Sequence, residues 1–345
     1  MTNDYNFLVL HDFPEPGIES LWREFLKRVE LPSHYCAPEY FREPFWSGKR
    51  PFAVVVLKQR DVVGVLTGIH QGIEVQCGMS ARPQICLDSR SDLSHTLNAL
   101  YQGLLTEIGT AQLVSIYSWN PLEPLSRMGF RERPQEGDVL LDLALGADTL
   151  FKQFHEGRRK TIRRAMVRFG VEVSEVTTSE DIDASYNVYR QWRETKRKKI
   201  EWEEISFSVF EEACKLRTNR IVFLARHAGH AIAVLSLRFY QEGLIEASGN
   251  HSVDEYLHLY PNELLHWRAI EWACREGLRS YSFGGAHTFL RRFGGEVAPV
   301  YRYRIDRSWL RRHDFGESFV SWGRDWLKRM PAPVEQKVRR VLGKS

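Results

Sequence analysis

The chain has 345 residues, more than one ordinary hydrophobic core accommodates, so its length predicts two domains. Hydrophobic residues make up 43% of it and charged residues 27%, as in soluble globular proteins, and a net charge of +4 does not call for DNA as a stable partner. No apolar run reaches the roughly 18 residues of a membrane-spanning helix, and the opening MTNDYNFLVL lacks the basic start of a secretion signal. The five cysteines have no CxxC or Cys/His ligand spacing, which indicates reduced thiols in a cytoplasmic protein and no bound metal.

The first half of the chain predicts helices around an antiparallel meander. Residues 18–29 have the spacing of an amphipathic helix. Apolar runs broken by polar turns over residues 51–78 predict paired strands. Residues 91–109 begin with a helix cap and stop at glycine, which predicts a helix. Three more elements are expected before Ala147: a strand at residues 111–119, a short helix at 121–130 and a strand at 138–145.

The second half repeats this order with little sequence identity to the first. A helix over residues 149–170 precedes a strand and two further helices, and a meander follows over residues 219–250. A helix over residues 260–276 and two last strands complete the repeat. The sequence therefore predicts a mixed α+β fold with two like-built domains, each a mostly antiparallel sheet flanked by helices. The expected divisions are 1–147, 148–310 and a basic helical tail at 311–345.

The start of the helix over residues 260–276 is the first candidate site. A strand ending in EASGN and a loop lead into the helix near Asn262 and Glu263. Free backbone N–H groups and the helix dipole at such a start suit an anion, for example the pyrophosphate of a cofactor. Packing of the apolar helix face against the sheet explains the same pattern without a ligand.

A carboxylate and polar residues on the preceding strand are candidates for chemistry. Glu246 lies among apolar neighbours, where a raised pKa would suit a general base, although a structural pair with an arginine is the alternative. Asn250 and His251 follow at the strand end and are candidates for substrate binding. His266 is a further candidate on the helix, although a lone histidine is more often structural.

Two basic clusters predict a phosphate-rich ligand. In the helix over residues 149–170, Arg159 and Arg163 stand four residues apart and repel each other unless an anion lies between them. Arg197 and Lys199 belong to the second cluster, RQWRETKRKK. A solvated basic face explains either cluster alone, but two clusters beside one cleft favour a nucleotide sugar, a lipid pyrophosphate or an RNA end. Trp322 and Trp326 in the basic tail suit either an anionic membrane surface or the protein's own core.

Several motifs together resemble the FemAB-like and BioF2-like acyltransferases, which have two tandem GNAT-type domains. One segment of the family resembles RRKTIRRAMVRFGVEV in this sequence. A turn of the family resembles TKRKKI, with Lys199 at the position where the family usually has glycine. The strand that ends in FGG also resembles the family, with Ser282 where an aspartate is usual. FLRRFGGE resembles the family's Phe-Lys segment, with Leu290 in place of the lysine and Arg291 and Arg292 after it. The resemblance is clearest over residues 151–306 and implies a tandem GNAT fold.

The resemblance implies an N-acyltransferase that takes an acyl group from acyl-CoA, or an aminoacyl group from tRNA, without a metal. The acceptor would be an amine of a peptidoglycan, envelope or exopolysaccharide precursor, nucleotide- or lipid-linked, at the inner face of the membrane. Glu246 would be the base, and backbone N–H groups or Arg291 and Arg292 would stabilise the oxyanion. The alternative is a non-catalytic scaffold or RNA-binding module that uses the basic helices.

Overall fold

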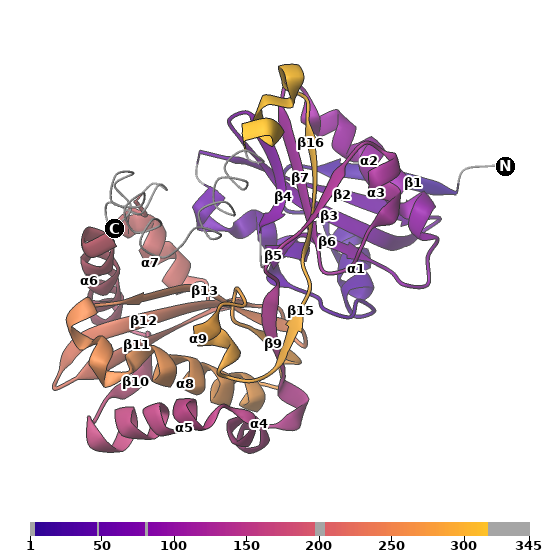
Figure 1. Cartoon of the computed structure of the whole chain (residues 1–345). Coiled ribbons are helices and arrows are strands. Elements are labelled where there is room, and N and C mark those ends of the chain that lie inside the picture. The colour runs from indigo at the N-terminus through magenta and orange to yellow at the C-terminus, as the bar shows by residue number, and fades with distance from the viewer. Residues whose placement is uncertain (1–3, 47, 80–81, 197–203, 317–345) are drawn as a thin grey trace, which may run out of the picture.

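The computed structural model describes residues 4–46, 48–79, 82–196 and 204–316. The chain forms two lobes, each built on a central sheet with helices against its faces (Figure 1). Most neighbouring strands of both sheets are antiparallel. The predicted α+β class with two like-built sheets is therefore confirmed.

The first sheet runs in the order β1-β2-β3-β4-β7-β16-β8, with β5 beside β4 and β6 beside β3, and only β4 and β7 are parallel. Alternate residues of β2 face opposite sides: Val54 and Val56 pack under α2 (Leu93–Ile108), whereas Val55 packs against α1 (Pro16–Leu26). A short helix, α3 (Glu123–Arg127), follows β7. The strands are β1 (Tyr5–Leu10), β2 (Arg50–Lys58), β3 (Asp61–Gln71), β4 (Glu74–Met79), β5 (Arg82–Pro83), β6 (Ile85–Leu87), β7 (Leu113–Ser118), β8 (Arg131–Pro134) and β16 (Tyr301–Asp306).

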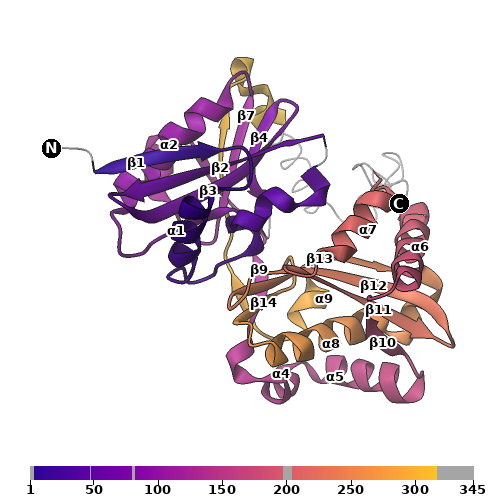
Figure 2. The same cartoon turned by 180° about the vertical axis from the view of Figure 1, so that it is seen from behind.

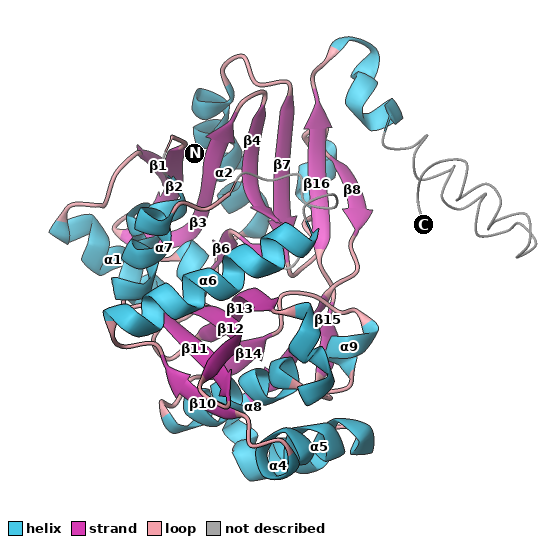
Figure 3. Ribbon diagram, turned by 90° about the vertical axis from the view of Figure 1, so that its left-hand side faces the viewer, coloured by secondary structure: helices cyan, strands magenta, loops and turns pink. Residues whose placement is uncertain are grey.

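The second sheet runs in the order β10-β11-β12-β13-β14-β9-β15, and only β13 and β14 are parallel. Helices α6 (Ser179–Lys196) and α7 (Phe207–Lys215) cover the face that carries Val222, and α8 (Pro261–Arg275) covers the face that carries Phe223 (Figure 3). The strands are β9 (Asp138–Asp142), β10 (Glu172–Glu175), β11 (Arg220–His227), β12 (His230–Phe239), β13 (Leu244–Ser252), β14 (Ser280–Ser282) and β15 (Glu296–Ala298). Shorter helices are α4 (Ala147–Gln153), α5 (Glu156–Arg163) and α9 (Thr288–Arg291).

The two lobes exchange strands, which the sequence did not predict. Strand β9 was expected in the first half but pairs with β14 and β15, and β16 was expected in the second half but pairs with β7 and β8. Figure 1 shows magenta β9 among the orange strands and yellow β16 among the purple ones. The buried Tyr303 fixes β16 there, since its hydroxyl accepts from Leu122 N at 2.6 Å and donates to Glu132 at 2.8 Å. The proposed boundary at Ala147 thus follows a strand that already belongs to the second sheet.

The single helix expected over residues 149–170 is broken. Helix α4 ends at Gln153, and α5 begins after His155, whose extended backbone donates its N–H to Arg292 O and whose Nδ1 caps Gly157 N. A wide turn of π-helix follows over Arg164–Arg168. The prediction of one continuous helix was wrong, because residue spacing does not reveal that the His155 N–H bonds to Arg292 O, far along the chain, and leaves the helical path.

A buried ionic cluster joins the lobes. Glu43 of the first lobe is buried and pairs with Arg220 and with Arg238, at 2.9 Å from Arg238 Nε, on two strands of the second sheet. His34 Nε2 lies 3.1 Å from the same carboxylate, and Arg238 also donates to Tyr35 Oη at 2.6 Å. The lobes therefore meet through buried charge as well as apolar contact (Figure 2 views the junction from behind).

We expect Gly295→Ala to destabilise the protein by about 2–4 kcal/mol, because the substitution strains the backbone and forces a close contact. Gly295 has φ +85°, and an added Cβ would lie 2.3 Å from Leu140 O on β9. Urea denaturation measures the loss. Gly17→Ala in α1 is the control: nothing lies within 4 Å of its added Cβ, so it should leave stability unchanged or raise it. Equal stability of the two variants would contradict the close packing of β15 on β9.

Candidate functional site

The two parallel strands of the second sheet part after a short run. Residues Leu244–Glu246 of β13 pair with Ser280–Ser282 of β14, and β13 then continues alone beside β12. The chain leaves β14 at Gly284, which has φ +76° and whose absent Cβ would lie 2.8 Å from Ala247 O. Only glycine permits so close a turn here. The strands therefore separate directly after Glu246.

A cavity of about 400 Å³ lies where the strands part, and we call it the split cavity. Its walls include Ala247, Asn250, Asn262, His266, Phe283 and Leu290. Asn250 and Asn262, both predicted to bind ligand, thus lie in one wall, and their roles remain predictions. Leu290 makes the wall apolar where the resembling family carries lysine.

A buried polar chain supports the inner wall of the split cavity. His266 Nε2 lies 3.2 Å from Asn250 Nδ2, and Nδ1 lies 2.8 Å from Tyr281 Oη. Burial lowers the pKa of His266 to about 3, so the ring is neutral at physiological pH. These two contacts link Asn250 to Tyr281 through the His266 ring, which also lines the split cavity.

The start of α8 borders the split cavity, as predicted, but it already contains a charge pair. Tyr260 adopts a left-handed conformation before Pro261, and no side chain caps the first turn. Asn262 Oδ1 accepts from Ser252 Oγ at 2.5 Å, which ties the helix start to the end of β13. Glu263 pairs with Arg158 at 2.7 Å. A ligand anion at this helix start would have to lie beside that carboxylate.

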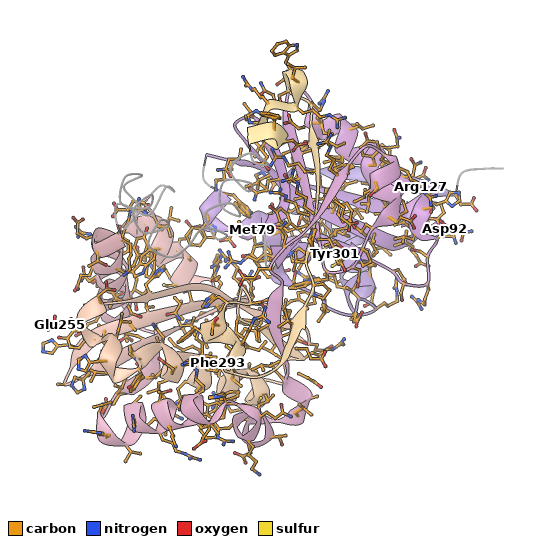
Figure 4. The ribbon with its side chains drawn as sticks, viewed as in Figure 1. Met79, Asp92, Arg127, Glu255, Phe293 and Tyr301 are labelled. Carbon is orange, nitrogen blue, oxygen red and sulfur yellow. The ribbon has the colours of Figure 1, made fainter. Side chains whose placement is uncertain are left out.

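Arg158 is the basic residue that the sequence analysis missed. Its guanidinium is buried, donates to Phe289 O at 2.8 Å and stacks 4.4 Å from the ring of Phe293 (labelled in Figure 4). Arg158 has the same helical spacing as the buried Ile162 and Ala165, so the periodicity placed it on the inner face. The spacing of residues 158, 162 and 165 in the sequence therefore already indicated that Arg158 lies on the buried face of the helix.

Arg159 and Arg163, two of the predicted phosphate-binding arginines, do not line the split cavity. Arg159 donates to Lys152 O at 2.5 Å, and Arg163 is exposed with its guanidinium 5.3 Å from the ring of Phe151. Arg197 and Lys199 lie outside the described residues, as do Trp322 and Trp326 of the tail. The structure thus does not bring the two basic clusters together among the residues that it describes.

A second cavity, of about 150 Å³, lies on the other side of β13, and we call it the junction cavity. Arg82, Ser248 and Gly249 belong to the walls of both cavities. The β12–β13 register jumps from Leu237↔Ala247 to Ser236↔Gly249, so Ser248 is the extra residue of a β-bulge. Such a bulge takes backbone groups out of the ladder. The bulge therefore borders both cavities.

Arg82 of the first lobe holds the bulge in place. Its Nη2 donates to Ala247 O and Ser248 O, at 3.2 Å each, and its Nε pairs with Glu246. It was not predicted, because a lone arginine in MSARPQ carries no pattern. The bulge of the second lobe is therefore held by a residue of the first lobe.

Glu246 is buried beneath the bulge and does not line either cavity. Burial raises its pKa, and the charges of Arg82 and Arg238 oppose the shift. His251, by contrast, lines the junction cavity, where burial lowers its pKa to about 4. Arg291, the last residue of α9, and Arg292, which follows it, are exposed, and Arg291 Nε donates to Ala286 O at 2.5 Å. Of the three catalytic candidates Glu246, Arg291 and Arg292, Glu246 is the one connected to the bulge in the described residues. Arg82 makes this connection, because it pairs with Glu246 and donates to Ser248 O.

Other hollows lack these features. One of about 530 Å³ is lined by residues such as Arg23, Tyr240 and Arg279, and none of its lining residues belongs to β13 or β14. In the first lobe, a hollow of about 360 Å³ beside the start of α2 contains Asp88, whose pKa Arg90 lowers by hydrogen bonding. Within the described ranges, no helix is long and apolar enough to cross a membrane. Nor do any three His, Cys, Asp or Glu side chains among the described residues group as metal ligands.

Comparison with known proteins places this geometry in context. Residues 156–294 match the family model of the acetyltransferase (GNAT) domain. The structure of FemX is 13% identical with a TM-score of 0.64, and the match covers 87% of this chain and 98% of that one. A tandem GNAT protein of the clavulanic acid biosynthesis pathway is 13% identical with a TM-score of 0.57, covering 88% and 99%. L-PGS from Bacillus licheniformis is 13% identical with a TM-score of 0.55, covering 87% and 93%. No curated protein matches the sequence.

Most of the second lobe thus matches the model of a GNAT domain, and the whole chain has the fold of a tandem GNAT protein. The resemblance to FemAB-like tandem GNAT proteins, predicted from the sequence, is confirmed as a likeness of fold.

Proposed function

We propose that the protein is an N-acyltransferase that moves an acyl or aminoacyl group from an activated donor to an amine. The observation that carries this proposal is that the split cavity and the junction cavity meet at Ser248–Gly249. A transfer between two substrates needs their reacting atoms held about 3 Å apart, which two cavities on either side of one strand can provide. The GNAT fold of the second lobe supports the same reaction class.

In this proposal the donor's acyl group occupies the split cavity and the amine enters through the junction cavity. The amine nitrogen attacks the carbonyl carbon, the bond from that carbon to the donor sulfur or oxygen breaks, and the donor leaves as a thiol or as free tRNA. Backbone N–H groups at the bulge donate to the oxyanion that forms. We propose these groups in place of Arg291 and Arg292, which are not among the residues that line the two cavities.

Glu246 is the proposed base that takes the proton from the amine. Its raised pKa is the direction that a base at neutral pH needs. Its carboxylate reaches the bulge through Arg82, which pairs with Glu246 and donates to Ser248 O. Because Glu246 lines neither cavity, the proton passes to it through a bound water, and Glu246 then returns a proton to the leaving sulfur or oxygen of the donor.

The donor and acceptor rest on the FemAB-like resemblance, supported by the fold likeness to FemX and L-PGS. We propose acyl-CoA or aminoacyl-tRNA as donor and a nucleotide- or lipid-linked envelope, peptidoglycan or exopolysaccharide precursor as acceptor. The reaction would take place in the cytoplasm, at the inner face of the membrane.

A donor screen tests the proposal. Purified protein is offered acetyl-CoA, longer acyl-CoAs and charged tRNA with a panel of amines, and release of free thiol or free tRNA is followed. We expect one donor class to be consumed only when an amine is present. If every donor stays inert, the transferase proposal fails. Salt-dependent RNA binding that Glu246→Gln leaves unchanged would then favour the non-catalytic alternative.

A substitution beside the split cavity tests whether the donor binds there. Gly284→Ala should lower kcat/KM for the active donor at least about tenfold, because the added Cβ presses on Ala247 O and shifts the parting strands. Gly277→Ala is the matched control, since Gly277 also has positive φ but nothing lies within 4 Å of its added Cβ. Similar activity of the two variants would contradict the placement of the donor.

A further inference from the structure

The junction cavity has more positive than negative charge around it, and two of the positive groups, Arg220 and Arg238, are buried. Its walls contain the guanidinium groups of Arg82, Arg220 and Arg238. Only two carboxylates pair with these three groups in the described chain: Glu43 with Arg220 and Arg238, and Glu246 with Arg82. An uncompensated buried charge is costly, so an anion in this cavity would complete the pairing.

Neighbouring titratable groups do not remove the surplus. His34 contacts Glu43, but burial lowers its pKa, so it is neutral and adds no charge. Asp138 is the next buried carboxyl group, and burial raises its pKa to about 7. It accepts hydrogen bonds from Ser282 Oγ and Gly285 N, and no ion pair joins it to the three arginines in the described part of the chain.

Two buried nitrogen atoms in the cavity walls lack partners. Arg220 is 5% exposed, and its Nε has no hydrogen-bond partner among the residues described. The same holds for His251 Nδ1, whose ring packs 4.4 Å from that of Trp192. A carboxylate accepts a charge-assisted hydrogen bond from a guanidinium N–H. Arg220 therefore offers both a positive charge and a free donor to a carboxylate in this cavity.

The size and walls of the junction cavity indicate a small ligand group. Its volume of about 150 Å³ lies below the roughly 300–1,000 Å³ of sites that enclose whole drug-sized ligands. Phe45, Phe210 and Leu237 supply apolar contact for a short carbon chain. A single surplus charge matches a monoanionic carboxylate better than a doubly charged phosphate.

We infer that the junction cavity binds a carboxylate of the acyl acceptor, so that the acceptor is an amine that also carries a carboxylate, such as an amino acid or an acidic peptide segment. The inference rests on the proposed acyl transfer. The carboxylate pairs with Arg220, and the amine points to Ser248–Gly249, where the split cavity begins. Arg220 thereby determines which amines are accepted.

Paired acceptors test the inference. 4-Aminobutyrate and L-lysine are compared with their carboxamides, both in transfer and in direct binding by calorimetry. We expect each carboxylate to be used at least about tenfold better than its amide, through KM, since a hydrogen bond to a charged group is lost in the amide. Arg220→Gln should remove the preference and leave KM for the donor unchanged. Arg275→Gln, on the exposed end of α8, should retain it.

The outcomes separate this inference from the proposed function. Transfer that is indifferent to the carboxylate overturns the inference while acyl transfer stands. Carboxylate binding that Arg220→Gln weakens, without transfer from any donor, keeps the cavity assignment and rejects the transferase. Binding of neither acid, or tighter binding of inorganic phosphate, overturns the inference. If Arg220→Gln does not fold, Arg220→Lys keeps the charge but removes the free Nε donor and should weaken the preference for the carboxylate.

Discussion

Glu43→Ala should lower the free energy of unfolding by about 3–5 kcal/mol, the loss expected when one partner of a buried ionic cluster is removed. Glu43 is buried and is the carboxylate that pairs with Arg220 and Arg238. Without it, two guanidinium groups remain buried at the junction of the lobes. Urea denaturation measures the change. Glu123→Ala, which removes an exposed carboxylate paired with Arg127, is the control and should cost well under 1 kcal/mol.

The same residue predicts how stability depends on pH. Burial alone would raise the pKa of Glu43, but Arg238 and Arg220 outweigh burial and hold the pKa well below its ordinary value of 4.5. A carboxyl group with a depressed folded-state pKa stabilises the fold above its unfolded pKa, and this stabilisation is lost as the pH falls below about 4.5. Glu43→Gln should therefore flatten the decline in stability between pH 5 and pH 3. A decline as steep as in the natural protein would contradict the ionised cluster.

Local patterns in the sequence predicted the features that depend on residues close together in the chain. The spacing of apolar residues located α8, and the glycines after β14 marked the point where the strands part. Arg158 also followed from local spacing, because it shares a helix face with Ile162 and Ala165. It was missed because the exposed arginines beside it dominated the interpretation of that helix.

Contacts between distant segments could not be predicted from one sequence. Arg82 and Ala247 are 165 residues apart, and Glu43 and Arg220 are 177 residues apart, so no local period links them. The exchange of β9 and β16 between the two lobes was not predicted for a related reason. Alternating apolar residues predict a strand, but they do not identify the sheet whose edge it completes. The lobes therefore looked separable in sequence, whereas the site between the cavities depends on both.

Arg82→Met should reduce kcat for acyl transfer about 100-fold or more while KM for the donor changes little. Arg82 is a positioning residue in the proposal: it donates to Ala247 O and Ser248 O and pairs with Glu246, and it belongs to the walls of both cavities. Its loss leaves Glu246 buried without a partner and frees the bulge that presents the oxyanion donors. Removing one oxyanion donor in other enzymes costs about 10²–10³ in kcat, and displacing the bulge should act on the same step.

Two further variants separate this role from mere loss of stability. Arg82→Lys keeps the charge but cannot bridge two carbonyl groups and a carboxylate with its single ammonium, so it should retain an intermediate kcat. Combining Arg82→Met with Glu246→Gln should cost much less than the product of the two single effects, because the pair acts as one unit. Arg127→Met, on an exposed side chain, is the control. A kcat within threefold of the natural protein for Arg82→Met in a folded sample would show that the bulge does not need the first lobe, and the proposed coupling of the two lobes in catalysis would have to be abandoned.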